Sequence, residues 1–443
     1  MKLKTCVTCV QYRGLVAAAI ALLAASTAAA YDLLDIKGTA TKLSVNADTV
    51  GAAFFNSNSW FGQSEEFLGA NTDHWQELGV EPRLSFETRA GKGTLSAQLS
   101  GVYTKTYDDD ASGLTVGLDD TDSFTLEQAN IGWKVTDLFE GLEKDEFSIT
   151  IGRQDYTIGT GLIVNDGGGD GGERGGWYLG MRKAFEDSVI VRLNTDKWVL
   201  EGFHIENRPR GGGIKGHADG ANAEYTFADG VKLGGSYLKV DPNLPDADSL
   251  NVFSGRIDWG GERKLHLRGE YVTEQNDQID ANGWYTEISY HADTVSWSPT
   301  FSYRYAHFDG DDPRTADDEQ FREIAYGFTD YGTWYQGEIA GNYPLGNANV
   351  VSHMLRAKLK PREDLTMNVL CYRFMLDQPR SLDPAVTDHH FGDEVDVTFD
   401  WQATDKLYFI GVIGALFPGD AAKQWTGGND NWLYSMLYLS YAW

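Results

Sequence analysis

The sequence predicts an all-β protein: a transmembrane antiparallel up-and-down β-barrel of about 18 strands with long extracellular loops. Short segments alternate apolar and polar residues with a period of two. Glycine (50 residues) and aromatic residues (13%) are abundant, whereas proline (11 residues) is scarce. The chain also ends in an alternating segment that closes on the aromatic residue Trp443. After the N-terminal segment no apolar run reaches the roughly 18 residues that a transmembrane helix needs, so the sequence favours a barrel.

The N-terminus predicts a secretory signal peptide at residues 1–30. Basic residues precede an apolar run from Leu15 to Ala25, and small residues continue to Ala30. This run is too short to cross a membrane as a helix, and its flanks are those of a cleaved signal. Residues 31–443 are then expected to form a single outer-membrane barrel domain.

Charge and cysteine content exclude several classes of protein. The formal net charge of −28 disfavours nucleic acid as a partner. Removal of the signal leaves Cys371 alone, so neither an internal disulfide nor a Cys-x-x-Cys metal pair is expected.

Eighteen segments show strand character. The expected strands cover approximately residues 41–50, 79–89, 94–104, 123–134, 146–154, 187–194, 198–206, 220–228, 231–240, 249–259, 263–273, 283–291, 296–306, 350–360, 364–375, 392–402, 405–416 and 432–443. Short turns and long polar segments alternate between them, which places both termini at one end and the long loops outside. The segment at 307–349 is long enough to hide a further hairpin.

The alternation assigns apolar side chains to lipid and polar side chains to the lumen. For example, Leu84 and Phe86 alternate with Arg83, Ser85 and Glu87. Eighteen strands enclose an aqueous lumen unless loops fill it. The candidate pore-lining residues are Arg83, Glu87, Arg89, Arg192, Arg256, Arg268, Arg304, Arg356, Lys358, Glu394 and Asp396. These charges either pair across strands and stiffen the wall or guide a solute through the pore.

The excess negative charge lies in loops. Carboxylates are the ligands that Ca²⁺ prefers, so Asp108, Asp110, Asp309 and Asp311 are candidate ligands for loop-bound calcium. The alternative is that these side chains are solvated loop tips without a ligand. No other cofactor is expected.

Two segments resemble the alginate export porin family. The first is Ile151-Gly152-Arg153-Gln154, followed by Gly159 and Gly161. It is similar to a family strand that ends in Gly-Arg-Gln and runs into a Gly-x-Gly loop, although Glu186-Asp187 replaces the usual Asp-Gly further on. The second comprises Gly392-Asp393-Glu394-Val395-Asp396 and Phe417-Pro418-Gly419. It is similar to the family's closing pattern.

The resemblance implies an outer-membrane porin that passes an anionic polysaccharide, such as alginate or related oligosaccharides, through an arginine-lined pore. It would place Arg153 in the conduit and give the long loops a role in access. It also implies a monomer. Further expected partners are outer-membrane lipid and lipopolysaccharide, a carbohydrate solute, and the assembly machinery, which would read the strand ending in Trp443.

Two other functions are weighed against a porin. An enzyme is not expected, because no Gly-x-Ser-x-Gly or His-Glu-x-x-His motif occurs and the histidines are scattered. A structural or adhesive envelope barrel is the alternative that remains open. It would bind calcium through its loops and have a closed lumen.

Overall fold

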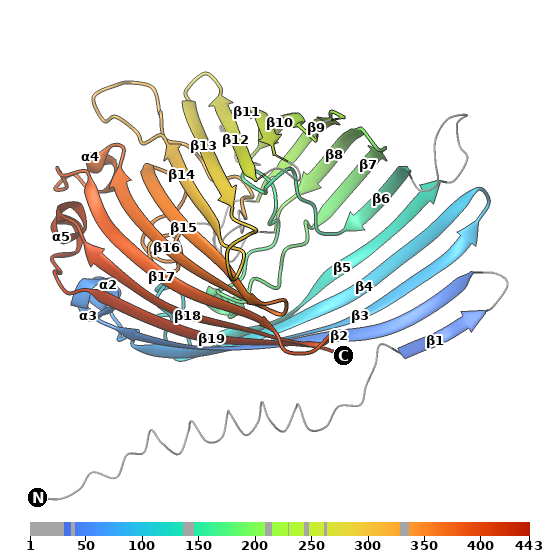
Figure 1. The fold of residues 1–443 in the computed structure, drawn as a ribbon, viewed down its shortest axis with the longest axis horizontal. Helices are drawn as coiled ribbons and strands as arrows, with labels where there is room; N and C mark the ends of the chain where they lie inside the picture. The colour runs from blue at the N-terminus through green and yellow to red at the C-terminus, as the bar shows by residue number, and fades with distance from the viewer. Residues whose placement is uncertain are drawn as a thin grey trace, which may run out of the picture.

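Eighteen antiparallel strands close into a barrel in a computed structural model that describes residues 31–36, 40–135, 146–208, 215–228, 230–242, 248–260, 264–327 and 336–443. Each strand from β2 to β19 pairs with its neighbour in the sequence, and β19 pairs with β2 to complete the ring (Figure 1). The expected signal peptide lies outside the described residues. The fold class predicted from the alternation is confirmed.

An additional short strand, β1 (Tyr31–Ile36), precedes the eighteen strands of the barrel. The first half of the barrel comprises β2 (Thr41–Ser57), β3 (His74–Ala90), β4 (Gly93–Tyr107), β5 (Asp122–Val135), β6 (Phe147–Arg153), β7 (Asp187–Asn194), β8 (Trp198–Glu206), β9 (His217–Thr226) and β10 (Lys232–Asp241). The second half comprises β11 (Leu250–Trp259), β12 (Leu265–Gln275), β13 (Asp280–His291), β14 (Thr300–Phe308), β15 (Val350–Arg362), β16 (Leu365–Leu376), β17 (His390–Gln402), β18 (Leu407–Pro418) and β19 (Trp432–Ala442).

Short helices occur only in the long connections of the described chain: α2 (Ser59–Gly62), α3 (Ser64–Phe67), the 3₁₀ turn η1 (Gly172–Arg174), α4 (Pro379–Leu382) and α5 (Asp420–Thr426). None of these helices is long and apolar enough to cross a membrane.

All eighteen expected strands overlap a barrel strand, but β1 was not predicted. Its physical role follows from the pairing. β19 pairs with β2 only as far as Asp48, whereas β1 pairs with residues 41–45 of β2. β1 therefore covers a length of β2 that would otherwise be an open sheet edge. The possible hairpin within 331–340 is only partly testable, because residues 331–335 lie outside the described residues and 336–340 form turns.

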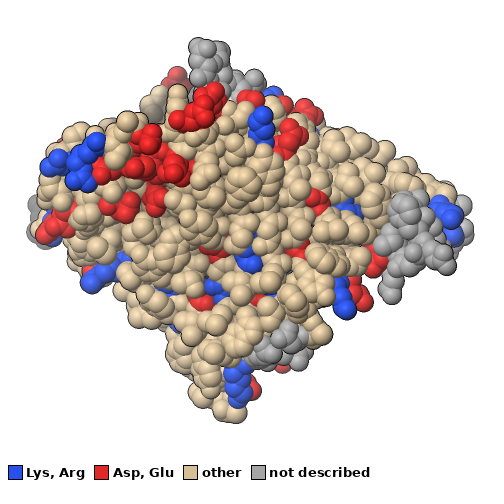
Figure 2. All heavy atoms as spheres, turned by 90° about the horizontal axis from the view of Figure 1, so that it is seen from above, with Lys and Arg blue, Asp and Glu red and all other residues tan. Residues whose placement is uncertain are grey.

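The side chains alternate as the membrane requires. Leu355 and Ile413 are about 60% exposed on the outer face (61% and 62%), while their strand neighbours Met354 and Val412 are buried inward. Figure 2 shows acidic side chains gathered toward one end of the molecule, with uncharged residues forming most of the remaining visible surface. This distribution is that of a barrel with an apolar outer belt.

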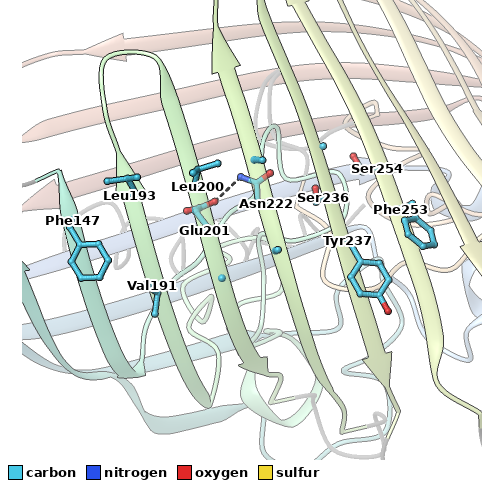
Figure 3. A pocket seen from close by; sticks show the side chains of 14 residues that line it. Phe147, Val191, Leu193, Leu200, Glu201, Asn222, Ser236, Tyr237, Phe253 and Ser254 are labelled. Atoms are coloured by element: carbon cyan, nitrogen blue, oxygen red, sulfur yellow. Dashed lines mark hydrogen bonds between the residues drawn. The ribbon is translucent and has the colours of Figure 1, made fainter. Parts of the chain in front are cut away.

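The outer face across β6–β11 contains a shallow apolar depression of about 700 Å³ (Figure 3). It is lined by small residues such as Gly202 and Ala223 and by the larger side chains of Leu200, Tyr237 and Phe253. Leu200, Tyr237 and Phe253 are exposed on the outer face, whereas Glu201, which also lines the depression, is buried. The depression thus belongs to the outer wall and not to the lumen.

Candidate functional site: the lumen and its two inner loops

Two long connections occupy the lumen. We name residues 154–186, between β6 and β7, inner loop 1, and residues 309–327 and 336–349, between β14 and β15, inner loop 2. The loops join through backbone hydrogen bonds: Asn165 N donates to Ala325 O (2.6 Å), and Gly327 N donates to Gly161 O (3.0 Å). The hydroxyl of Tyr178 also donates to Glu338 of inner loop 2 (3.2 Å). Access through the barrel therefore depends on how these joined loops are held.

Buried wall carboxylates hold inner loop 1. Glu77 of β3 accepts hydrogen bonds from the backbone N–H groups of Tyr178 (3.0 Å) and Leu179 (3.2 Å). Glu127 of β5 accepts from those of Lys183 and Ala184, both at 2.7 Å. Each carboxyl group accepts two backbone N–H donors in a site shielded from water, where a hydrogen bond is stronger than in bulk solvent. The acidic side chains of this wall thus anchor a loop.

Inner loop 2 is held in the same way. Glu394 of β17 accepts from Ile339 N (2.8 Å) and Ala340 N (2.7 Å), and Asp396 accepts from Glu338 N (3.3 Å). Glu394 and Asp396 do face inward, as their parity predicted. However, both are completely buried beneath the loop, so they do not line an open lumen surface in this structure.

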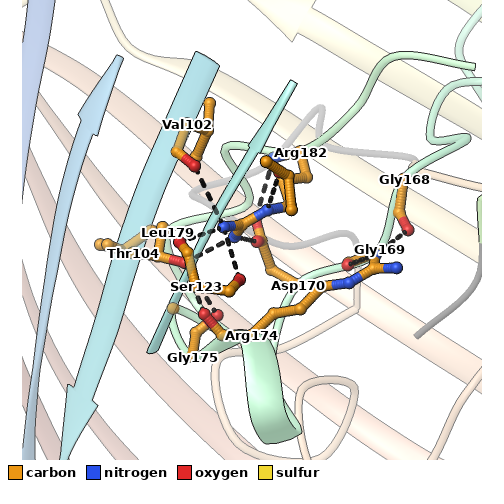
Figure 4. Close-up of polar contacts among 12 residues, drawn as sticks. Val102, Thr104, Ser123, Gly168, Gly169, Asp170, Arg174, Gly175, Leu179 and Arg182 are labelled. Atoms are coloured by element: carbon orange, nitrogen blue, oxygen red, sulfur yellow. Dashed lines mark hydrogen bonds and ion pairs between the residues drawn. The ribbon is translucent and has the colours of Figure 1, made fainter. Parts of the chain in front are cut away.

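A dense polar cluster ties inner loop 1 to β4 and β5 (Figure 4). The guanidinium of Arg182 pairs with Asp170 at 2.5 Å and donates to Thr104 and to Thr125, at 2.5 and 2.7 Å. It also donates to the backbone carbonyl of Ser123 (2.8 Å). Arg182 and Asp170 are both buried. A buried ion pair needs such additional hydrogen bonds to offset the cost of desolvation.

Burial also perturbs the carboxyl groups of this loop. It raises the pKa of Asp166 to about 6, against the opposing effect of hydrogen bonds from Gly168 and Gly169. Burial raises the pKa of Asp170 as well, and the positive charge of Arg182 partly offsets this increase.

The candidate arginines lie mainly in the half of the lumen nearer the short turns, where they pair across strands. Glu287 lies between Arg268 and Arg304, directly opposite each in the strand register. Its carboxylate is 3.1 Å from Arg268 Nε and 2.9 Å from Arg304 Nη2. Arg304 also lies over the ring of Tyr285, with its guanidinium carbon 4.9 Å from the ring centroid.

Arg256 joins the wall to inner loop 1. Its guanidinium lies 3.1 Å from Glu224 of β9, two strands away, and 3.5 Å from Glu270 of the adjacent strand β12. Gly159 of the loop packs so closely that a Cβ there would lie 2.7 Å from the guanidinium. A cavity of about 180 Å³ opens beside this contact, lined in part by Arg256, Arg268 and Gly159.

The remaining candidate residues are more exposed. Arg83 is 3.0 Å from Glu81, and Arg192 is 2.5 Å from Glu201. The side chains of these two arginines keep 29% and 41% of their surface exposed. Arg356 donates to Asn368, Lys358 is half-buried near the short-turn end, and Glu87 and Arg89 are exposed near the end of β3.

The Gly-Arg-Gln segment closes the base of inner loop 1. Gly152 has φ +112°, and a Cβ there would lie 2.3 Å from Ala129 O, so the position requires glycine. Arg153 pairs with Glu186 at 3.5 Å, and Gln154 forms an isolated β-bridge with Phe185. Arg153 is thus largely enclosed, with 11% of its side chain exposed, at the neck of the loop.

The other motif glycines and the closing motif shape turns. Gly161 has φ +81° at the junction of the two inner loops. Phe417 and Pro418 end β18, and Gly419 N donates to Phe391 O (2.7 Å) just before α5 begins. A Cβ on Gly419 would lie 2.1 Å from His390 O.

Comparisons with known proteins agree with this architecture. The family model for alginate export matches residues 243–433. Three solved structures from Pseudomonas aeruginosa share the fold, each with a TM-score of 0.57. OpdQ is 13% identical and covers 91% of this chain and 97% of its own. OccK9 (OpdG) is 14% identical, with coverage of 91% and 98%. OccD3 (OpdP) is 11% identical, with coverage of 94% and 93%. No curated protein matches the sequence.

The chain is a porin-type barrel of the bacterial outer membrane. The resemblance to alginate export porins is confirmed over residues 243–433, which include the closing motif but not the Gly-Arg-Gln segment. The partial family match and the porin-type fold together point to an outer-membrane channel.

The candidate calcium ligands of this porin-type barrel do not come together. Asp110 is buried and accepts hydrogen bonds from Ser112, whereas Asp108 lies 4.0 Å from His74. Asp311 accepts from the backbone of Glu319 (3.4 Å). Asp309 lies instead beside His307 and Asp377.

Several important residues were not predicted. Glu77, Asp170 and Arg182 were not among the candidates, although all three hold inner loop 1. Parity identifies an inward side chain, but it carries no information on whether a loop will cover it. Glu77 was missed for a further reason: the strand expected from the sequence began only at residue 79, whereas β3 begins at His74.

Proposed function

We propose that this barrel gives passive passage across the outer membrane to a hydrophilic, anionic polysaccharide such as alginate or related oligosaccharides. The alginate export match carries the proposal, because the matched segment supplies five of the inward basic candidates: Arg256, Arg268, Arg304, Arg356 and Lys358. Positive groups along a pore attract anions, and their carboxylate partners keep the attraction weak enough for release. Such a conduit needs no catalytic residue.

The test is single-channel conductance of the purified, folded barrel in a planar bilayer, with the reversal potential measured in a salt gradient. We expect anion preference, and a block by alginate oligosaccharides. Arg192→Gln should shift selectivity toward cations, since it removes a positive charge from the lumen and leaves Glu201 without its ion-pair partner. Arg373→Gln is the matched control, because Arg373 pairs with Asp393 on the outer face. Cation preference of the wild-type channel would refute an anionic solute while retaining a channel.

A second candidate is a structural or adhesive envelope barrel with a closed lumen and calcium bound by its loops. The junction between the two inner loops favours it, because those loops meet inside the barrel. A folded barrel without conductance in the same bilayer would support this candidate over a channel. Conductance unaffected by calcium would argue against it.

The proposed partners follow from the outer-membrane barrel. Its apolar belt contacts lipid and lipopolysaccharide, and the assembly machinery binds strand β19. Trp443 follows that strand and is held in place: its Nε1 donates to Thr49 Oγ1 (2.9 Å), and its backbone N donates to Ala47 O (2.8 Å). A monomer is proposed as the working state.

A further inference from the structure

Outside the lumen, one histidine and two aspartates converge at the long-loop end of β14 and β16. His307 is the penultimate residue of β14, Asp309 follows β14, and Asp377 follows β16. Phe308, Val350 and Leu376 lie in register across β14–β16, which brings the two aspartates to the same rim. His307 Nε2 is 3.4 Å from Asp309 Oδ1 and 3.2 Å from Asp377 Oδ1.

We propose that His307, Asp309 and Asp377 bind a divalent transition-metal ion of the zinc class. Zinc takes nitrogen ligands at about 2.0–2.1 Å and carboxylate oxygen at about 2.0–2.2 Å, usually in a tetrahedron. Neighbouring ligands of such a tetrahedron are about 3.4 Å apart. The two measured separations, 3.4 and 3.2 Å, fit this geometry, and the three ligand atoms all lie within 4.8 Å of one another.

The nitrogen of His307 supports a ligand independently of the acidic groups. Nε2 is covered by protein and makes no hydrogen bond of good geometry, although two carboxylate oxygens face it. A buried polar atom without a satisfied hydrogen bond is uncommon and calls for an explanation. An ion placed between Nε2 and the two oxygens would satisfy all three groups.

The outer shell of the site is already built. The second oxygen of Asp309, Oδ2, accepts from Asn282 N (2.8 Å) and Asn282 Nδ2 (3.2 Å). Oδ2 of Asp377 accepts from Gly310 N (3.0 Å). Each aspartate is thus oriented with one oxygen bound to protein and the other directed at His307. Ligating carboxylates in metal sites are commonly held by hydrogen bonds of this kind.

The donor set favours zinc over calcium. Calcium takes six to eight oxygen ligands at about 2.3–2.6 Å, whereas this site offers two carboxylate oxygens and an imidazole nitrogen. An imidazole suits zinc and neighbouring transition ions. The three side chains are each about one quarter exposed, so an ion can enter and a water can complete the tetrahedron. This site shares only Asp309 with the calcium ligands expected from the sequence.

Zinc binding to the folded, full-length barrel tests the proposal. Protein stripped with a chelator would be titrated with ZnCl₂ in competition with a chromophoric chelator, and bound zinc counted by elemental analysis. We expect one ion per chain. Loss of a direct ligand in His307→Ala or in Asp377→Asn should lower the zinc affinity by at least the roughly 10–100-fold that is typical for loss of an outer-shell partner. Calcium in large excess should not displace the zinc. Heat-modifiable migration on gels would verify that each variant is folded.

His204→Ala is the matched control. His204 also faces outward and lies 2.8 Å from a carboxylate, Asp219, but that site has a single acidic partner within the same reach. The control should bind zinc as the wild type does. Equal binding by the wild type and His307→Ala would overturn the proposal and identify His307 as an ordinary ion-pair partner of the two aspartates. An equal loss of binding in His204→Ala would also overturn it, by showing that the zinc binds nonspecifically.

Discussion

Loss of Arg182 should release inner loop 1 from the barrel wall. The side chains of Arg182 and Asp170 are 2% and 1% exposed and 2.5 Å apart. In Arg182→Met, Asp170 would remain buried without its cation, and several hydrogen bonds to β4 and β5 would be lost. Breaking a buried pair in this way typically costs about 3–5 kcal/mol. That corresponds to a roughly 10²- to 10³-fold increase, or more, in the ratio of released to bound loop.

The released loop can be measured by proteolysis of the folded barrel. Proteinase K should cut within residues 154–186 faster in Arg182→Met, because cleavage follows the population of the opened state. The barrel itself should keep its heat-modifiable migration, since the strand pairs do not depend on Arg182. Channel current should also become larger or noisier.

A double variant tests whether the buried ion pair between Arg182 and Asp170 anchors inner loop 1. Replacing both members of a buried pair with apolar residues is commonly much less costly than removing one. Arg182→Met combined with Asp170→Leu should therefore restore part of the protease resistance. Lowering the pH should also protect the single variant, because protonation removes the unpaired charge of Asp170. If the single variant is as resistant as the wild type, or if the double variant is no better, Arg182 does not anchor the loop.

Three further predictions concern the motif, the pH response and the terminal strand. Gly152→Ala should cost about 1–3 kcal/mol because of its positive φ and the contact with Ala129 O. Gly255→Ala, where a Cβ meets nothing within 4 Å, should leave the urea midpoint nearly unchanged. Because burial raises the pKa of Asp166 to about 6, packing of inner loop 1 should be strongest below about pH 4 and weaken as the pH rises through 6; Asp166→Asn should flatten this dependence in hydrogen exchange. Deleting Trp443 should lower the amount of folded barrel in the outer membrane, and an unchanged amount would argue against recognition of the terminal aromatic.

The strands were predictable because each one has lipid on one face and water on the other, and this requirement shows in the strand's own sequence. A strand that separates lipid from water must alternate apolar and polar side chains. Leu84 and Arg83 can therefore be assigned to the lipid face and the lumen face without knowledge of the neighbouring strands. Even the pairing of Arg268 with Glu287 follows once the strand register is known. The strand β1 was missed because it pairs with the part of β2 that β19 does not reach. The length of that uncovered edge is set by the closed barrel and not by residues 31–36.

The inner loops were not predictable for a related reason. Their position depends on distant partners, such as Tyr178 N with Glu77 and Ala340 N with Glu394. The groups that bind are backbone N–H groups, which every residue other than proline possesses, so the loop sequence carries no distinctive signal. The Gly-Arg-Gln segment was recognised by resemblance, but its role at the neck of inner loop 1 required the structure.

Some inward acidic residues are covered by the inner loops, so the net charge exposed to a solute in the lumen differs from the net charge of all inward residues. Parity places further acidic residues on the inner wall beside the candidate pore-lining residues, so that acidic and basic side chains are nearly balanced there, which would oppose an anionic polymer. These further residues are Glu127, Glu201, Glu224, Asp258, Glu270, Glu287 and Asp400. Yet Glu127 and Glu394 are buried under the loops they hold, and their carboxyl oxygens accept hydrogen bonds from backbone N–H groups instead of facing the solute. Arg83 and Arg192 retain 29% and 41% of their side-chain surface exposed. The charge that a solute meets is therefore more positive than the sequence indicates. Releasing inner loop 1 should consequently expose carboxylates and shift the channel toward cations, so Arg182→Met should alter selectivity as well as conductance.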